Sequence, residues 1–172
     1  MESKSDHHHK KRLDISWEKY GKMARELAKK VKEEFDPDCV VGNSKGGCIV
    51  GATLAGILRL DFYPMRISRR KKDRVVFKKP KISVYPPKDI QGKKVLLVDD
   101  MAVSGETFVM VEKMLAKEKP QAVKTLSLAR HKDSFKPDFC GLSSDDCITF
   151  PWDKWVYTKK GFVLHPEYNT SS

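Results

Sequence analysis

The segment 95–107 carries the residues whose types and spacing point most clearly to chemistry. A run of apolar residues, Val95 to Val98, ends in two carboxylates, Asp99 and Asp100, and a loop of small residues follows. Two adjacent carboxylates can accept hydrogen bonds from a diol or hold a hydrated cation. The backbone N–H groups of a loop that opens a helix favour a phosphate. This segment therefore predicts a phosphate site beside a site for a diol or a hydrated cation.

The loop at 43–47 is a second candidate for anion binding. It follows a short apolar strand predicted at 39–42 and precedes an apolar helix predicted at 48–60. Glycines let a backbone approach a ligand closely, and a lysine adds positive charge beside exposed amides. The loop residues assigned to this site are Ser44, Lys45, Gly46 and Gly47.

The elements that must position these loops are an alternation of helices and strands. Helical spacing of apolar residues predicts a helix at 17–34, with Ser16 as its N-cap and Asp36-Pro37 as its end. A second amphipathic helix is predicted at 108–119. Strands are predicted at 39–42, 62–68, 95–98, 123–129 and 139–142. The alternation predicts an α/β fold with a mostly parallel sheet, which binds ligands at the carboxyl ends of its strands.

Length and composition describe one globular domain. The 172 residues are 40% hydrophobic, enough for a substantial core. The apolar stretches are too short to span a bilayer and no signal-peptide core follows Met1, so we expect a cytoplasmic protein without a membrane partner. The four cysteines lack metal-ligand spacing and are interpreted as reduced thiols. We expect a disordered tail at 1–14, including His7-His8-His9, a domain at 15–160 and a C-terminal tail at 161–172.

Positive charge is concentrated in the segment 66–94. The formal net charge of the chain is +11, and this segment holds twelve Lys or Arg against two acids, which gives +10. Such a block suits a solvated basic face, a nucleic-acid patch or the rim of a site for a polyanionic small molecule. Few aromatic residues are interleaved, which weakens the case for single-strand stacking. Two alternating runs, 74–77 and 82–85, predict a flexible hairpin.

The acidic segment resembles the phosphoribosyl-diphosphate (PRPP) signature of the type I phosphoribosyltransferases. The family pattern of a strand, two Asp, a loop and [ST]-G-x-T is matched by Asp99, Asp100, Ser104, Gly105 and Thr107.

Two further segments extend this resemblance over residues 17–153. The loop at 44–47 stands where the family has its pyrophosphate loop, with Lys45 in place of the usual Arg. The sequences K-P-D-F at 136–139 and C-I-T-F-P-W-D at 147–153 resemble the hypoxanthine/guanine/xanthine branch, especially its short microbial xanthine–guanine type.

The resemblance implies a type I phosphoribosyltransferase (Rossmann-like) fold with a small hood, to which the flexible basic hairpin at 66–94 corresponds in position. It implies a Mg²⁺-dependent transferase of purine salvage, which moves the 5-phosphoribosyl group of PRPP to a purine base and releases pyrophosphate. The partners implied are PRPP, a purine base or nucleotide monophosphate, and a second copy in a homodimer.

The resemblance also implies a role for individual residues. The catalytic pair would be Asp99 and Asp100. The 5′-phosphate would bind at Val103, Ser104, Gly105, Glu106 and Thr107, and pyrophosphate at Ser44, Lys45, Gly46 and Gly47. The base would contact Lys132, Cys147 and Ile148. The metal would bind at Asp99, Asp100 and Asp153.

Two positions depart from the branch pattern. Val103 stands where the 6-oxopurine enzymes place an acid facing the purine, and Cys147 stands where they place a stacking aromatic. A valine cannot exchange a proton with a base. Two alternatives to the purine enzyme therefore remain: a PRPP- or nucleotide-sensing regulatory protein, which would bind RNA through 66–94, and a phosphoribosyltransferase with a non-purine acceptor. Nucleic acid is the less favoured partner.

Overall fold

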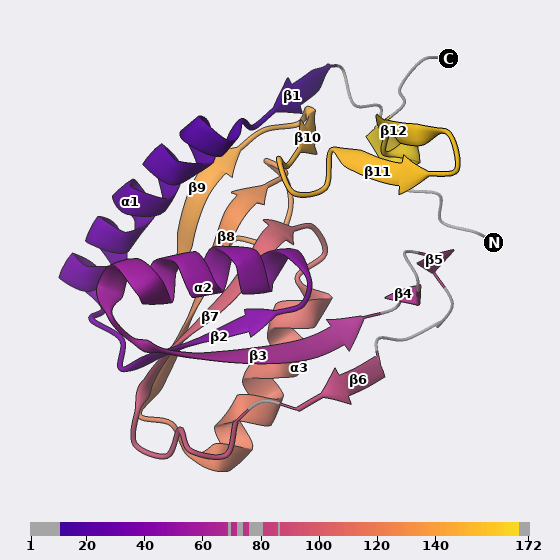
Figure 1. Cartoon of the computed structure of the whole chain (residues 1–172). Helices are drawn as coiled ribbons and strands as arrows, with labels where there is room; N and C mark the ends of the chain where they lie inside the picture. Colours follow the sequence, from indigo (N-terminus) through magenta and orange to yellow (C-terminus); the bar gives the residue numbers. More distant parts are fainter. Residues whose placement is uncertain (1–10, 69, 72–73, 76–80, 86, 169–172) are drawn as a thin grey trace.

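A six-stranded sheet forms the centre of the molecule (Figure 1). The computed structural model describes residues 11–68, 70–71, 74–75, 81–85 and 87–168; the expected tail residues His7-His8-His9 lie outside them. The strands follow the order β6-β3-β2-β7-β8-β9, and every neighbouring pair except β3 with β6 is parallel. Their bounds are β2 Cys39–Asn43, β3 Asp61–Ser68, β6 Lys81–Val84, β7 Lys94–Ala102, β8 Ala122–Arg130 and β9 Phe139–Ser143. The predicted α/β fold is confirmed.

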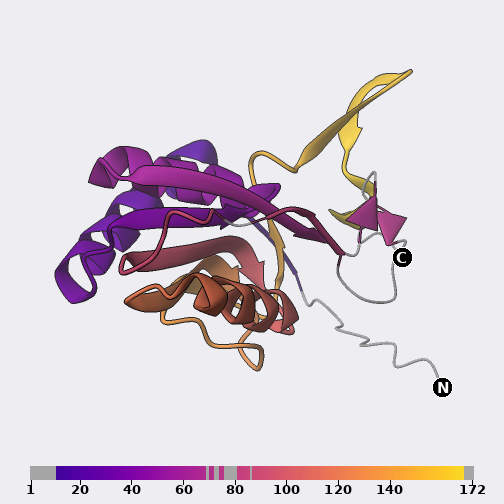
Figure 2. The same cartoon turned by 90° about the horizontal axis from the view of Figure 1, so that it is seen from below.

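Helices cover both faces of the sheet. Figure 2 shows α1 (Trp17–Glu34) and α2 (Gly46–Leu58) on one side and α3 (Glu106–Leu115) on the other. A short 3₁₀ helix, η1 (Ala116–Glu118), follows α3. Ser16 caps α1 as predicted, because its side chain accepts a hydrogen bond from the backbone N–H of Lys19.

Two apolar cores lie on either side of β7, which is buried on both faces as predicted. Leu96 and Val98 pack under α1 and α2, whereas Val95 and Leu97 pack against α3, and all four are almost fully buried. Successive side chains of a strand point to opposite faces, so a run of apolar residues satisfies both cores at once.

Strand β7 continues beyond the apolar run. It was predicted to end at Val98, but its pairing with β8 continues to Ala102, which lies opposite Arg130. The acidic pair therefore lies within a strand, where hydrogen bonds to the neighbouring strand fix the backbone.

The basic segment folds differently from the predicted hairpin. β4 (Arg70–Lys71) pairs with β5 (Arg74–Val75), while β6 pairs with β3 and extends the main sheet antiparallel. The run at 82–85 thus finds a partner in the open edge of β3. The remainder of the run at 74–77 lies outside the described residues.

Each of the two segments predicted as tails, 1–14 and 161–172, contributes an ordered strand that pairs with a strand of the predicted domain. β1 (Arg12–Asp14) pairs in parallel with β10 (Cys147–Thr149), and β11 (Trp155–Thr158) pairs with β12 (Gly161–Leu164). A 3₁₀ helix, η2 (Pro166–Tyr168), follows β12. Strands this short carry too little periodicity to be recognised alone. Among the described residues, no helix has the length and apolar character needed to cross a membrane.

Candidate active site

The acidic pair lies half-buried at the carboxyl end of β7. Burial and the neighbouring charge of Asp100 raise the pKa of Asp99 well above its usual range. Burial likewise raises the pKa of Asp100, whose backbone N–H donates to Asp99 Oδ1 over 3.0 Å. Two carboxylates in this environment repel each other, so a cation or a pair of hydroxyl donors placed between them would stabilise their ionised forms.

Asn43 connects this pair to the neighbouring strands. Its side-chain Nδ2 donates to Asp99 Oδ2 over 3.1 Å, and its Oδ1 accepts from the backbone N–H of Ile67 over 3.0 Å. The side chain is almost fully buried. Sequence reasoning did not assign Asn43 to the site. The available signal was a polar amide that ends a buried strand immediately before the 44–47 loop.

The 44–47 loop packs directly against the acidic pair. A Cβ added to Gly46 would overlap the carboxylate of Asp100, and a Cβ added to Gly47 would lie 2.6 Å from the carbonyl oxygen of Val98. Only glycines allow this approach of the two loops. The peptide bond between Ser44 and Lys45 is cis.

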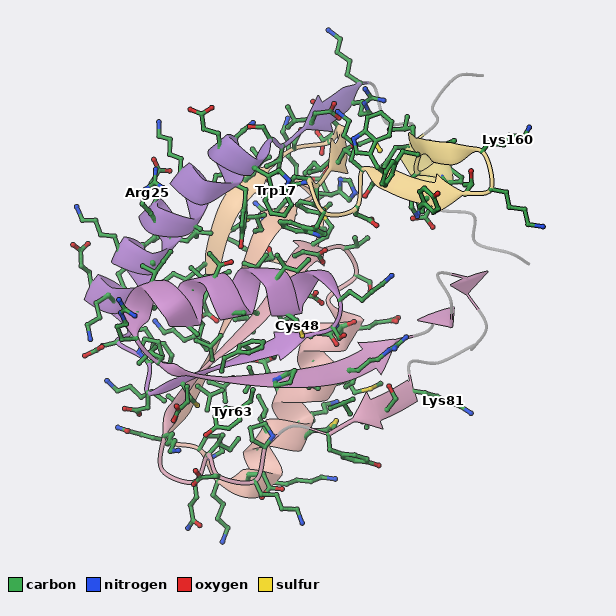
Figure 3. All side chains as sticks on the ribbon, viewed as in Figure 1. Trp17, Arg25, Cys48, Tyr63, Lys81 and Lys160 are labelled. Atoms are coloured by element: carbon green, nitrogen blue, oxygen red, sulfur yellow. The ribbon has the colours of Figure 1, made fainter. Side chains whose placement is uncertain are left out.

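Helix α2 starts earlier than predicted, so both glycines belong to its first turn. It begins at Gly46 instead of residue 48, and no side chain caps its N-terminus. The Sγ of Cys48, labelled in Figure 3, donates to the carbonyl of Gly42 over 3.3 Å and ties the helix to the end of β2. The partial positive charge of the helix N-terminus consequently lies beside Asp100, where it favours anions.

The 103–107 loop forms the other side of the acidic pair. Gly105 adopts a left-handed conformation, with φ of 74°, and a Cβ there would overlap the ring of Phe135. The backbone N–H of Phe135 donates to the carbonyl of Val103 over 3.2 Å. Helix α3 then begins at Glu106, so that residue and Thr107 lie in its first turn. The loop presents the N-terminus of a helix at the edge where β7 ends, which suits a phosphate.

The residues predicted to contact a base lie at the end of β8 and in β10. Lys132 is exposed and forms an ion pair with Asp145 over 3.3 Å. The side chains of Cys147 and Ile148 are buried. The N–H of Cys147 donates to the Lys11 carbonyl, toward β1. Because alternate residues of a strand direct their backbone groups to opposite edges, the N–H and C=O of Ile148 face away from β1.

The aromatic residues of the 147–153 segment pack into a cluster with α1. Phe150 and Trp152 stack with ring centroids 5.0 Å apart, and Tyr20 meets Trp152 edge-on at 5.1 Å. Trp152 also contacts Trp17, whose side chain is 60% exposed (Figure 3). These rings anchor the segment that carries Asp153 to the body of the domain.

The three residues predicted to hold a metal come from two separate parts of the fold, β7 and the loop after β10. Within the described part of the chain, no cluster of three or more His, Cys, Asp or Glu side chains is arranged to bind a metal ion. Asp99 and Asp100 remain adjacent, but Asp153 follows β10, outside the main sheet, and accepts a hydrogen bond from the Tyr168 hydroxyl over 2.8 Å. The charge of Asp153 still contributes to raising the pKa of Asp100.

The comparisons with known proteins identify the class to which this fold and site belong. Residues 16–158 match the family model of the phosphoribosyl transferase domain, so the chain belongs to the phosphoribosyltransferase family. It is 32% identical over 146 residues to the hypoxanthine-guanine phosphoribosyltransferase of Aquifex aeolicus (strain VF5), covering 80% of this chain and 82% of the relative. The resemblance to the short microbial purine branch of the type I enzymes is thereby confirmed.

Solved structures agree with this assignment. The purine phosphoribosyltransferase of Pyrococcus horikoshii Ot3 superposes with a TM-score of 0.76 at 25% identity, covering 86% of this chain and 97% of the other. The Helicobacter pylori xanthine-guanine-hypoxanthine phosphoribosyltransferase shares the fold, with a TM-score of 0.69 at 24% identity over 82% and 92% of the two chains.

Proposed function

We propose that the protein is a purine phosphoribosyltransferase of nucleotide salvage, which transfers the 5-phosphoribosyl group of PRPP to a purine base. In this reaction the bond between the anomeric carbon and pyrophosphate breaks, a bond from that carbon to a purine ring nitrogen forms, and the nitrogen loses its proton. The observation that carries the proposal is the contact of the Gly46-Gly47 turn with Asp99-Asp100. This contact brings the proposed pyrophosphate loop and the proposed diol-binding pair together at the carboxyl ends of neighbouring strands.

The acidic pair would fix the ribose. The carboxylates of Asp99 and Asp100 would accept hydrogen bonds from its two hydroxyls, with Asp99 oriented by Asn43. Fixing the sugar in a reactive orientation lowers the entropic part of the barrier. A transition state with oxocarbenium character would also be stabilised by adjacent negative charge.

The two loops would bind the two anionic ends of PRPP. The 5′-phosphate would lie at the first turn of α3, against Ser104 to Thr107, including the Gly105 and Glu106 amides. The departing pyrophosphate would lie at the first turn of α2, beside Ser44, Lys45, Gly46 and Gly47. Binding energy from the remote phosphate would orient the reacting carbon.

The acidic pair also fits the Mg²⁺ that the family implies. Asp99 and Asp100 offer hard oxygen ligands. Burial raises the pKa of both carboxyls, and the charge of Asp100 raises that of Asp99 further, so a bound divalent cation would offset these costs. These two residues would hold the ion through its coordinated water, and the bound ion would supply charge neutralisation for the pyrophosphate.

The base would bind between the end of β8 and the free edge of β10. The backbone N–H and C=O of Ile148 would read the purine edge, and Lys132 would donate to an exocyclic oxygen after leaving Asp145. Cys147, whose side chain is buried, offers no flat surface for stacking. Base recognition would therefore depend more on backbone hydrogen bonds than it does in relatives with an aromatic there.

Incubation with PRPP, Mg²⁺ and each purine base in turn tests this function, with the nucleotide and pyrophosphate measured together. Equal amounts of both products with at least one purine are expected. Binding of PRPP without turnover of any purine would contradict the proposal and favour a sensing protein or a non-purine acceptor. We expect the protein to be cytoplasmic and to form a homodimer; analytical sedimentation would show the dimer. We also expect the phosphoribosyltransferase domain to span residues 15–160.

A further inference from the structure

We propose that Tyr168 is a positioning residue that holds the carboxylate of Asp153 beside the acidic pair, at the edge of the cation and pyrophosphate site. This inference rests on the proposed function and adds a residue to its site. Tyr168 lies beyond residues 16–158, which match the family model, and no sequence motif points to it.

The contact between the two side chains is specific. The Tyr168 hydroxyl donates to Asp153 Oδ2 over 2.8 Å, and its ring is 9% exposed. The ring packs at a tilt against His165, with centroids 5.4 Å apart. One carboxylate oxygen is thereby occupied, and the orientation of the other is fixed.

Backbone hydrogen bonds place Tyr168 where it can make this contact. We call residues 153–154 and 164–168 the C-terminal clasp. The N–H of His165 donates to the Lys154 carbonyl, and the N–H of Tyr168 donates to the His165 carbonyl, both over 2.9 Å. The Nζ of Lys154 also donates to Asp14 Oδ2 over 2.7 Å. The clasp is therefore attached to β1, which pairs with β10, the strand that ends at Thr149 and precedes the loop carrying Asp153.

Charge explains why a donor is needed at this point. Asp153 adds a third negative charge to the environment of Asp100. An ionised carboxylate beside two others is costly unless a donor or a cation compensates it, and a buried neutral phenol supplies a donor without cancelling the charge. Within the described ranges, no cluster of three metal-binding side chains includes Asp153. It would therefore act on the hydration shell of the cation, a role in which orientation matters.

The test compares wild-type protein with Tyr168→Phe, which removes one hydroxyl and keeps the ring against His165. Calorimetric titration with Mg·PRPP should show about tenfold weaker binding, the size typical of losing an outer-shell partner. In turnover assays the KM for PRPP should rise while kcat changes little. Tyr157→Phe is the matched control, because Tyr157 is 77% exposed on β11 and removal of its hydroxyl should change neither value.

A double-mutant cycle with Asp153→Asn separates positioning from general stability. If Tyr168 acts through Asp153, Tyr168→Phe should weaken Mg·PRPP binding in the wild-type background and have no effect in the Asp153→Asn background. The inference would be overturned if Tyr168→Phe bound Mg·PRPP as the wild type does, or if the two substitutions weakened binding independently so that their effects added. Neither result would contradict the proposed function, provided that the wild-type protein is active. Failure of the wild-type protein to bind Mg·PRPP would instead overturn the proposed function, and the inference with it.

Discussion

The side-chain amide of Asn43 donates a hydrogen bond of 3.1 Å to Asp99 and so joins the carboxyl ends of β2 and β7. The amide cannot rotate freely, because its oxygen accepts from the backbone N–H of Ile67 in β3. Three neighbouring strands thus determine how one carboxylate of the acidic pair points. Its orientation is built into the sheet and does not depend on the loop that follows.

Replacing Asn43 with alanine should shift the pH dependence of catalysis. The amide hydrogen bond lowers the pKa of Asp99, which burial raises, so its loss should raise that pKa further. If ionised Asp99 is required, the acidic limb of the kcat/KM profile for PRPP will move to higher pH, with the larger loss of activity below neutral pH. Profiles of the wild-type and variant proteins with coincident acidic limbs would contradict this role of Asn43.

Asp99→Asn should abolish activity and stabilise the fold at neutral pH. Burial raises the folded-state pKa of Asp99 above its ordinary value of 3.8, so its charge destabilises the protein above the raised pKa and has no such effect below 3.8. The Asn variant should therefore melt at a higher temperature at pH 7 to 8, by about 2–4 °C per kcal/mol recovered. This advantage should shrink as the pH falls toward 4.

Glu33→Gln provides the control for that comparison. Glu33 lies on the exposed face of α1 and forms a long ion pair of 3.9 Å with Lys29. Its neutralisation should leave the melting temperature nearly unchanged across the same pH range. A similar gain in both variants would contradict the burial of the acidic pair as the source of the instability.

Gly46→Ala should disrupt PRPP binding far more than its size suggests. The added methyl group would overlap the Asp100 carboxylate, so the Asp100 side chain or one of the two loops must move. We expect a loss of roughly 100-fold or more in kcat/KM, and a destabilisation of about 1–3 kcal/mol from overpacking. Gly56→Ala, in the same helix with nothing within 4 Å of the new methyl, should instead stabilise by about 0.5–1 kcal/mol.

Introducing an acid at position 103 should restore the missing proton acceptor. Val103 is 46% exposed, so an aspartate there stays solvated and can face a bound base. For Val103→Asp we expect kcat/KM for 6-oxopurines to rise roughly tenfold or more, consistent with general base catalysis. Val103→Asn, of similar shape but unable to accept the proton, should give no such gain. Equal rates for the two variants would place the acceptor elsewhere.

The main sheet and the position of the acidic pair could be predicted from the sequence, because both depend on local residue patterns. Helix α1 has the predicted bounds of 17–34, and β2, β3, β7 and β8 include the predicted strands, since each has a strong apolar run or helical period. The juxtaposition of the 44–47 loop with Asp99 and Asp100 also follows from pattern, because loops after neighbouring parallel strands meet at one edge.

Other features depend on contacts that local sequence does not encode. The end of β7 at Ala102 is set by pairing with β8, and the start of α3 follows from the left-handed conformation of Gly105. The hydrogen bond from Tyr168 to Asp153 links residues from two separate elements outside the periodic core. Such contacts can be recognised only once the chain is folded.

The fit between Gly46 and Asp100 constrains how this sequence can change over evolutionary time. A side chain at position 46 overlaps the carboxylate at position 100 unless that carboxylate moves, is shortened or is lost. The two positions should therefore change together or not at all in descendants of this protein. In a lineage that had lost the acidic pair, position 46 could accept a side chain. Loss of the acidic pair together with the glycine would therefore mark a change of function.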